Sequence, residues 1–257
     1  MISIELAGGL GNQLFQICNG LALSFRYNTE LFFPNYQENV NIIKYQHSPN
    51  AEEYLTTIYK NLNLKFDKIN DNHIHDQIQF NYYDVDYIQN TYYKGYFQSE
   101  KFFIDEEKKI KDIFYNELIK KYKNDENYAC IHIRRGDYIH QQHNHPVLTK
   151  SYYDSAIRKI DYDKLFIISN DLDWCKKYLN YPDSEYINDK DYECLYRMSQ
   201  CKSHIIANSS FSWWGAKFAE WYGNPEKILA PNVWFGLALN HLNTKDVVPE
   251  RWGRISC

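Results

Sequence analysis

The second half of the chain alternates short apolar runs with amphipathic segments, and this alternation constrains the fold more than any other feature. Each apolar run has the length of a buried strand, and each intervening segment has helical spacing. Alternating strands and helices predict an α/β fold with a parallel sheet and right-handed crossover connections. The predicted strands are Ala129–Ile133, Leu165–Ser169, His204–Ala207 and Ile228–Ala230, and the predicted helices are Ser151–Ile160, Leu172–Leu179, Tyr192–Cys201 and Phe211–Tyr222.

The N-terminus has the same order of elements. Ile2–Leu6 is an apolar run, and the glycine-rich segment Ala7–Gln13 follows it. Apolar residues then recur at helical spacing from Leu14 to Phe25, before a second predicted strand at Leu31–Phe33. A strand, a glycine-rich turn and a helix are typical of the first part of a nucleotide-binding α/β layer.

The polar run Lys120–Asn127 separates these two halves. The length of 257 residues is sufficient for two small domains, each with its own core. We therefore predict Rossmann-like domains at residues 1–125 and 126–257. The polar and aromatic stretch 37–90 carries no motif that assigns a function; Glu52–Leu62 within it and the segment from Glu100 towards Tyr122 are predicted helices.

Composition excludes several classes of protein. The net charge of −4 and the pI near 6.1 argue against a nucleic-acid binder, which carries a basic surplus. The six cysteines form no CxxC pair, which disfavours a zinc site or a disulfide framework and favours small buried hydrophobes. No apolar run has the length of a membrane span, and the chain begins directly in a predicted strand without a signal core. We expect a cytoplasmic protein.

Two adjacent arginines, Arg134 and Arg135, directly follow the predicted strand Ala129–Ile133. Ligands of open parallel sheets bind outside the carboxyl ends of the strands. Adjacent guanidinium groups repel each other, and a diphosphate would neutralise both while accepting their hydrogen bonds. The alternative is that one arginine is solvated and the other pairs with Asp137.

Three hydroxyl side chains and two tryptophans lie in the segment Asn208–Ala216, where a predicted helix follows a predicted strand. Free backbone N–H groups at a helix N-terminus attract anions, and the Ser209 and Ser210 hydroxyls add donors. The alternative is ordinary N-capping by Asn208 or Ser209.

Asp171 follows another predicted strand, Leu165–Ser169. Its carboxylate is suited to accept hydrogen bonds from the N1–H and exocyclic amine of guanine. Capping of the helix that contains Trp174 explains the same residue equally well. The glycines of Gly8–Gln13 would let the backbone approach a ligand closely.

Taken together, these segments resemble the α-1,2-fucosyltransferase family, glycosyltransferase family 11. The similarity spans residues 8 to 216, with the matching motifs in the family's order. Many members have two adjacent aspartates where this chain has Asn170-Asp171, and the chain is short for the family, which suggests a trimmed acceptor domain. The matching motifs are Gly8–Gln16, His132–Tyr138 and Ser209–Ala216.

The resemblance implies a GT-B-like fold, with two facing Rossmann-like domains and a cleft between them. It also implies that the C-terminal domain binds GDP-fucose without a divalent metal. Arg134 is then the main diphosphate ligand and Arg135 supports it, while Ser210 and the Phe211 amide hold phosphate oxygens. The full set of donor-binding residues implied is Gly11, Asn12, His132, Arg134, Arg135, Asp171, Ser209, Ser210 and Phe211.

The reaction implied is inverting transfer of fucose to the 2-hydroxyl of a terminal β-galactoside, so the partners are GDP-fucose and a galactose-terminated glycan. Arg134 would stabilise the departing diphosphate. Asp137 is the candidate general base, and orientation of Arg135 is its rival role. His140, His143 and His145 are expected to be solvated rather than to bind metal.

Other functions have weaker support. A nicotinamide-dependent oxidoreductase would need a full GxGxxG spacing, which Gly8–Leu14 lacks. A non-catalytic sugar-nucleotide or glycan-binding module would keep every binding residue, so only turnover separates it from an enzyme. A protein O-fucosyltransferase has similar motifs but a polypeptide acceptor. The sequence leaves the oligomeric state open.

Overall fold

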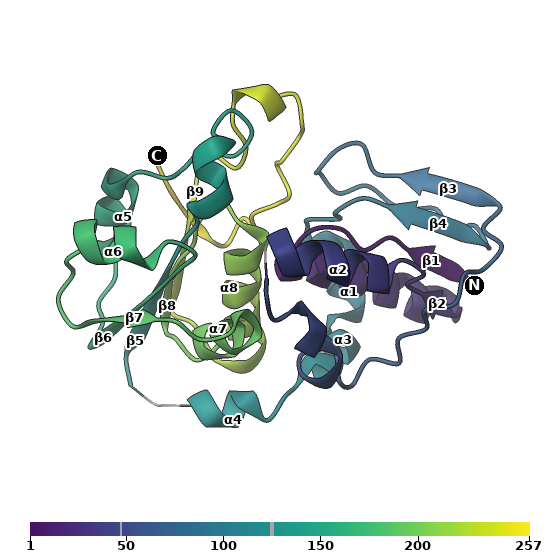
Figure 1. The fold of residues 1–257 in the computed structure, drawn as a ribbon, viewed down its shortest axis with the longest axis horizontal. Helices are drawn as coiled ribbons and strands as arrows, with labels where there is room; N and C mark the ends of the chain where they lie inside the picture. Colours follow the sequence, from purple (N-terminus) through teal and green to yellow (C-terminus); the bar gives the residue numbers. More distant parts are fainter. Residues whose placement is uncertain (47, 124–125) are drawn as a thin grey trace. The chain divides into compact units, whose positions relative to one another are not determined.

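The computed structural model describes residues 1–46, 48–123 and 126–257. The chain divides into two compact units, residues 1–116 with 243–249 and residues 117–242 with 250–257. Each unit is an α/β layer built on a parallel sheet (Figure 1), so the predicted fold class is confirmed. The predicted boundary after residue 125 adjoins Asn124 and Asp125, which lie outside the described residues, and it stays a prediction.

In the described part of the first unit, four parallel strands have the order β2-β1-β4-β3. The strands are β1 (Ile2–Ile4), β2 (Leu31–Phe32), β3 (His73–Asp76) and β4 (Thr91–Lys94). The α-helices are α1 (Leu10–Tyr27), α2 (Tyr36–Gln46) and α3 (Glu107–Phe114), and the 3-10 helices are η1 (Ala51–Thr56), η2 (Glu100–Phe102) and η3 (Ile104–Glu106).

The predicted N-terminal helix is confirmed as α1. Its residues Leu14, Ile17 and Cys18 are buried, as the helical spacing requires. The helix ends where Asn28 adopts a left-handed conformation and its N–H bonds to the carbonyl of Ser24, a common C-terminal cap.

In the described part of the second unit, six parallel strands have the order β10-β9-β8-β5-β6-β7. The strands are β5 (Tyr128–Ile133), β6 (Lys164–Ser169), β7 (Ser184–Ile187), β8 (Ser203–Ile205), β9 (Lys227–Pro231) and β10 (Gly253–Ile255). The helices are α4 (Leu118–Tyr122), α5 (Lys150–Ile157), α6 (Leu172–Tyr178), α7 (Asp191–Met198) and α8 (Ser210–Tyr222), with 3-10 helices η4 (Gly136–His140) and η5 (Leu237–Leu239).

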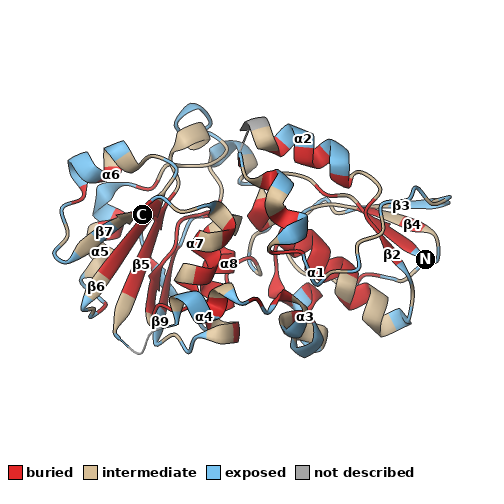
Figure 2. Ribbon diagram, turned by 60° about the horizontal axis from the view of Figure 1, so that its bottom comes forward, coloured by how far each residue is buried: buried red, intermediate tan, exposed pale blue. Residues whose placement is uncertain are grey.

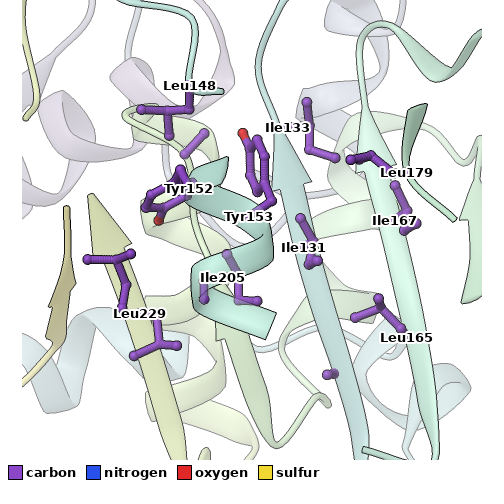
Figure 3. Packing of buried hydrophobic residues seen from close by; sticks show 14 of the residues in the cluster. Ile131, Ile133, Leu148, Tyr152, Tyr153, Leu165, Ile167, Leu179, Ile205 and Leu229 are labelled. Carbon is purple, nitrogen blue, oxygen red and sulfur yellow. The ribbon is translucent and has the colours of Figure 1, made fainter. Parts of the chain in front are cut away.

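The core of the second unit lies on both faces of this sheet. On one face, Tyr152 and Tyr153 of α5 pack over Ile131 and Ile133 of β5 (Figure 3). On the other face, side chains of β5 and β6 pack against α7, with Met198 fully buried. The strands β1 and β5 and the helices α1 and α8 are largely buried in their own units (Figure 2), whereas β3 is mostly exposed. Apolar packing on both faces of the sheet therefore fixes where the strand ends lie.

Two helical predictions are wrong. Glu52–Leu62 is only the short 3-10 helix η1, and the helix expected from Glu100 to Tyr122 is broken into η2, η3, α3 and α4. The break between α3 and α4 has a tertiary cause. The side-chain amide of Asn61 donates to the carbonyls of Ile113 and Tyr115, which a continuing helix would use internally.

The cysteine prediction holds for most of the six residues. Cys18, Cys130, Cys175, Cys194 and Cys201 are buried free thiols, whereas Cys257 is exposed. Among the described residues, no helix is both long and apolar enough to cross a membrane.

Candidate functional site

The strand order of the second unit marks a place for a ligand. From the central strand β5, the chain runs outward to β6 and β7 on one side, then returns to place β8, β9 and β10 on the other. In such sheets the loops leave β5 and β8 in opposite directions and open a crevice at their carboxyl ends. The arginine segment follows β5, and the serine–tryptophan segment follows β8.

Direct contacts join these two segments. The Tyr138 hydroxyl, from the loop after β5, donates to the backbone carbonyl of Asn208 at 3.1 Å. The His132 ring, on β5, lies 5.1 Å from the Phe211 ring in the first turn of α8. The structure therefore brings together residues 70 or more positions apart in sequence.

Arg134 is ion-paired but keeps an unused donor. Its Nη2 lies 2.8 and 3.0 Å from the two carboxylate oxygens of Asp137, and its guanidinium lies 5.3 Å from the Tyr138 ring centre. Its Nε is buried without a hydrogen-bond partner among the described residues. Leaving a buried donor unpaired costs about 1–3 kcal/mol, and more when the group is charged, so this Nε is suited to meet a ligand oxygen.

Arg135 has a different environment. Its Nε donates to Asp171 at 3.0 Å, and its guanidinium lies 4.1 Å from the Trp174 ring centre. Its backbone N–H donates to the Asn170 side chain at 2.9 Å. Arg135 is therefore anchored to the segment after β6.

The predicted alternatives for this arginine pair are corrected in part. One arginine does pair with Asp137, but the other is bound to Asp171 rather than solvated. Asp137 also orients Arg134 and not Arg135, because Asp137, in the first turn of η4, pairs with Arg134, while Arg135 is held by Asp171.

Asp171 caps α6, as one of its two predicted roles required. One carboxylate oxygen accepts from the Trp174 N–H at 3.2 Å, and the other accepts from Arg135. A carboxylate has about four lone-pair sites, so contact with guanine is compatible with both bonds and stays a prediction.

His132 is a buried, neutral histidine. It is 4% exposed, and burial together with the nearby charge of Arg134 lowers its pKa to about 3. Its Nδ1 has no hydrogen-bond partner among the described residues. A neutral imidazole offers one donor and one acceptor, so His132 can bind a polar group without adding charge.

The N-terminus of α8 lacks a side-chain cap, so N-capping, the alternative to anion binding, is not observed. Ser209 occupies the N-cap position in an extended conformation, but its hydroxyl makes no capping hydrogen bond. Asn208 instead donates through its amide to the carbonyls of Pro146 and Trp234, both at 3.1 Å. The first N–H groups of α8, at Ser210 and Phe211, therefore receive no cap from either residue, and a phosphate would satisfy them.

His145 contradicts the expectation that its loop is solvated. Its ring stacks on Tyr138 at 4.8 Å and meets Phe235 edge-on at 5.5 Å. Burial lowers its pKa below the usual value. No spacing in the sequence reveals this stack, because Phe235 follows β9 and reaches His145 only in the folded unit. His140 and His143 are exposed, as expected.

Gly11 and Asn12 lie in the first unit, at the carboxyl end of β1. Gly8 has φ +73°, and a Cβ on it would lie 2.5 Å from the Asn12 Nδ2. Only glycine therefore fits this turn without displacing Asn12. The Asn12 Oδ1 accepts a hydrogen bond from Gln98 at 2.9 Å, which fixes the amide orientation.

Among the described residues, no group of three or more His, Cys, Asp or Glu side chains is placed to hold a metal ion. The expectation of a metal-independent reaction stays a prediction, since the described side chains alone do not test it.

Comparison with known proteins identifies the family. The model of glycosyl transferase family 11 matches residues 1–229. The chain is 31% identical to an alpha-1,2-colitosyltransferase of Escherichia coli, over 99% of both chains. It is also 31% identical to a galactoside 2-alpha-L-fucosyltransferase of Caenorhabditis elegans, over 46% of this chain and 40% of that one.

Among solved structures, the fucosyltransferase NodZ from Bradyrhizobium aligns with a TM-score of 0.49 and 11% identity, covering 83% of this chain and 91% of that chain. The sequence match covers nearly the whole chain and by itself shows the family. The protein belongs to glycosyl transferase family 11 and is a glycosyltransferase.

Proposed function

We propose that this protein is an inverting, metal-independent fucosyltransferase that moves L-fucose from GDP-β-L-fucose to the 2-hydroxyl of a terminal β-galactoside. The observation that carries the proposal is that two groups of hydrogen-bond donors without partners follow adjacent strands at the carboxyl edge of one sheet. Arg134 keeps a buried, unpartnered Nε, and the α8 N-terminus beside it has no side-chain cap. Together they fit a diphosphate.

The chemistry follows from these donors. As the bond between fucose and the diphosphate breaks, negative charge develops on the leaving group. Arg134 and the N–H groups of Ser210 and Phe211 would stabilise that charge, and each preorganised donor contributes about 3–4 kcal/mol. His132, which is neutral, would supply a hydrogen bond without repelling Arg134.

Asp137 has two separable roles in this proposal. It orients the guanidinium group of Arg134 through the ion pair, and it is our candidate general base for the acceptor hydroxyl. Asp137→Asn keeps an oxygen that can accept from Arg134 but cannot take a proton. A general base typically contributes 10²- to 10⁴-fold in rate. If Asp137 only orients Arg134, the Asn variant keeps most of kcat.

A second donor is favoured by one specific observation, the full-length match to a colitosyltransferase. Colitose is fucose without its 3-hydroxyl. A site that hydrogen-bonds this hydroxyl rejects the deoxy sugar by about 10⁴-fold or more, whereas a site that leaves it in an apolar contact discriminates weakly. The ratio of kcat/KM for GDP-fucose and GDP-colitose therefore identifies the donor.

The test is release of GDP by purified protein in EDTA, with each donor and with or without lactose or N-acetyllactosamine. We expect acceptor-dependent release and an α-1,2-linked product identified by NMR. Loss of turnover in EDTA, restored by magnesium, would contradict the metal-free mechanism. Binding of GDP-fucose without turnover on any galactoside would favour a non-catalytic module instead.

A further inference from the structure

The carboxyl edge of the sheet in the first unit has its own arrangement of side chains. The order β2-β1-β4-β3 places the parallel strands β1 and β4 side by side, with β2 beyond β1 and β3 beyond β4. The strand order therefore reverses between β1 and β4, and ligands are expected outside their carboxyl ends. The turn Gly8–Gly11 follows β1, and the segment Gly95–Gln98 follows β4.

Amide side chains lock these two segments together. Gln16 accepts from the Ala7 N–H at 2.9 Å and donates to the Gly95 carbonyl at 2.8 Å. Gln98 donates to Asn12 at 2.9 Å. The segment after β4 is thereby held against the glycine turn.

The segment after β4 is also strained. Gly95 has φ +139°, and a Cβ on it would lie 2.4 Å from the Gln77 Cβ. Phe97, fully buried, has φ +48°, and its N–H donates to the Gln77 Oε1 at 2.6 Å. A bulky residue at positive φ is rare, and such strain gathers at functional sites. The Gln77 Nε2 is buried with no partner among the described residues.

This strained backbone presents Tyr96 to solvent. Tyr96 is 36% exposed, and its ring stacks on Phe80 with centroids 6.0 Å apart and an interplanar angle of 25°. Phe80 follows β3 and Tyr96 follows β4, so both belong to the ligand edge. Glu5, just after β1, is close enough for its charge to raise the pKa of Tyr96 further, after the larger effect of burial. The described residues give Glu5 no ion pair.

A second exposed stacked pair in this unit serves as a comparison. Tyr27 is 43% exposed and stacks on Tyr87 at 4.5 Å and 15°. Tyr27 is the last residue of α1, and α1 begins at the carboxyl end of β1. The Tyr27 pair therefore lies toward the amino end of the strands, where ligands of parallel sheets do not bind.

We propose that the stacked rings of Tyr96 and Phe80, with Glu5, bind the terminal sugar of the acceptor glycan. A pyranose has one apolar face, which fits the exposed Tyr96 ring, and its hydroxyls donate to the Glu5 carboxylate. Glu5 disfavours an anion here, so a neutral sugar is the occupant. The identity of that sugar as a galactoside rests on the proposed function.

The first experiment compares the wild type with Tyr96→Ala, Tyr96→Phe and the matched control Tyr27→Ala. Measurements are the KM for lactose, the KM for GDP-fucose and GDP release without acceptor. We expect Tyr96→Ala to raise the lactose KM roughly five- to tenfold, within the range for an aromatic contact. The donor KM and acceptor-free GDP release should not change. Tyr96→Phe and Tyr27→Ala should stay near the wild type.

Glu5→Gln tests the contribution of the carboxylate separately from that of the stacked aromatic rings. It should raise the lactose KM because an amide oxygen accepts more weakly than a carboxylate, and it should leave the donor KM unchanged. Equal effects of Tyr96→Ala and Tyr27→Ala, or an unchanged lactose KM in both Tyr96→Ala and Glu5→Gln, would overturn the proposal.

Saturation-transfer NMR with lactose tests the same surface without turnover. Contact present in the wild type and in Tyr27→Ala but lost in Tyr96→Ala supports the proposal, even if GDP-fucose proves not to be the donor. Absence of contact in the wild type, or contact unaffected by Tyr96→Ala, contradicts it.

Discussion

The side chains at the carboxyl edges of the two sheets differ in chemical character. The carboxyl edge of the second unit is ionic, with Arg134 paired to Asp137 and Arg135 paired to Asp171. The corresponding edge of the first unit is held by neutral amides, among them Gln16 and Gln98. Both edges arise from the same parallel topology.

This difference shows that strand topology determines where a site lies, whereas the side chains at that position determine which ligand it binds. Arginine forks and helix N-terminal N–H groups suit a multiply charged diphosphate. Amides, an aromatic stack and one carboxylate suit a neutral sugar. A transferase that joins a sugar nucleotide to a glycan needs one edge of each kind.

The largest effect is expected from Arg134→Ala. Because this variant removes the unpartnered Nε donor and the charge at the diphosphate position, kcat should fall about 10²- to 10³-fold. Steady-state kinetics and titration calorimetry with GDP measure the loss. Arg158→Ala, which changes an exposed arginine of the same unit, is the control and should retain wild-type kinetics. Full turnover in a folded Arg134→Ala protein would show that the reaction does not need the Arg134 guanidinium.

Acid should weaken the second unit more than the first. Burial lowers the folded-state pKa of His132 to about 3 and that of His204 to about 4, from an ordinary value of 6.5. Between each folded-state pKa and 6.5, the unfolded chain binds more protons than the folded chain. The free energy of unfolding is therefore greatest above pH 6.5 and declines as the pH falls. The maximum slope is about 1.4 kcal/mol per pH unit for each histidine.

Hydrogen exchange at pH 7 and pH 5, corrected for intrinsic rates, locates this effect. Amides of β5 and β8, which carry the two histidines, should lose more protection than amides of β1 and β4. His132→Asn should flatten the pH dependence of the unfolding free energy. Equal losses in both units would show that the buried histidines do not control the acid response.

The smallest effect concerns Asp171, whose two roles can be separated. Asp171→Ala should lower the free energy of unfolding by about 0.5–2 kcal/mol through loss of the α6 cap, while Asp171→Asn keeps a good cap. Thermal unfolding measures both, with the exposed neighbour Asp173→Ala as the control.

Comparing GDP with IDP, which lacks the exocyclic amine, tests whether Asp171 also contacts the base. A preference for GDP in the wild type that disappears in Asp171→Ala supports guanine recognition. An unchanged preference would leave Asp171 with the structural role alone.

Much of this arrangement could be predicted from local patterns. The apolar runs that became β5 and β6 and the helical spacing that became α1 and α8 depend on period and burial, which the chain carries in its own order. The strands β7 and β10 were not predicted, because runs such as Ser184–Ile187 are short and mixed and pair only when a neighbouring strand is present.

The pairing of charges could not be read from the sequence. Arg134 and Arg135 are adjacent and chemically identical, yet one turns to Asp137 in its own loop and the other to Asp171 after the next strand. His145 was likewise expected in solvent but stacks between Tyr138 and Phe235. Such contacts join different loops, so no local pattern encodes them.

The sequence by itself determined the family, the alternation of strands and helices, and the residue types available at each strand end. Only the tertiary structure decided which donors remain unused, such as the Arg134 Nε, and which backbone is strained, as at Phe97. The physical reason is that periodicity and motif chemistry act between neighbours in the chain. Hydrogen-bond satisfaction depends instead on partners that are distant in sequence and meet only when the sheet has formed.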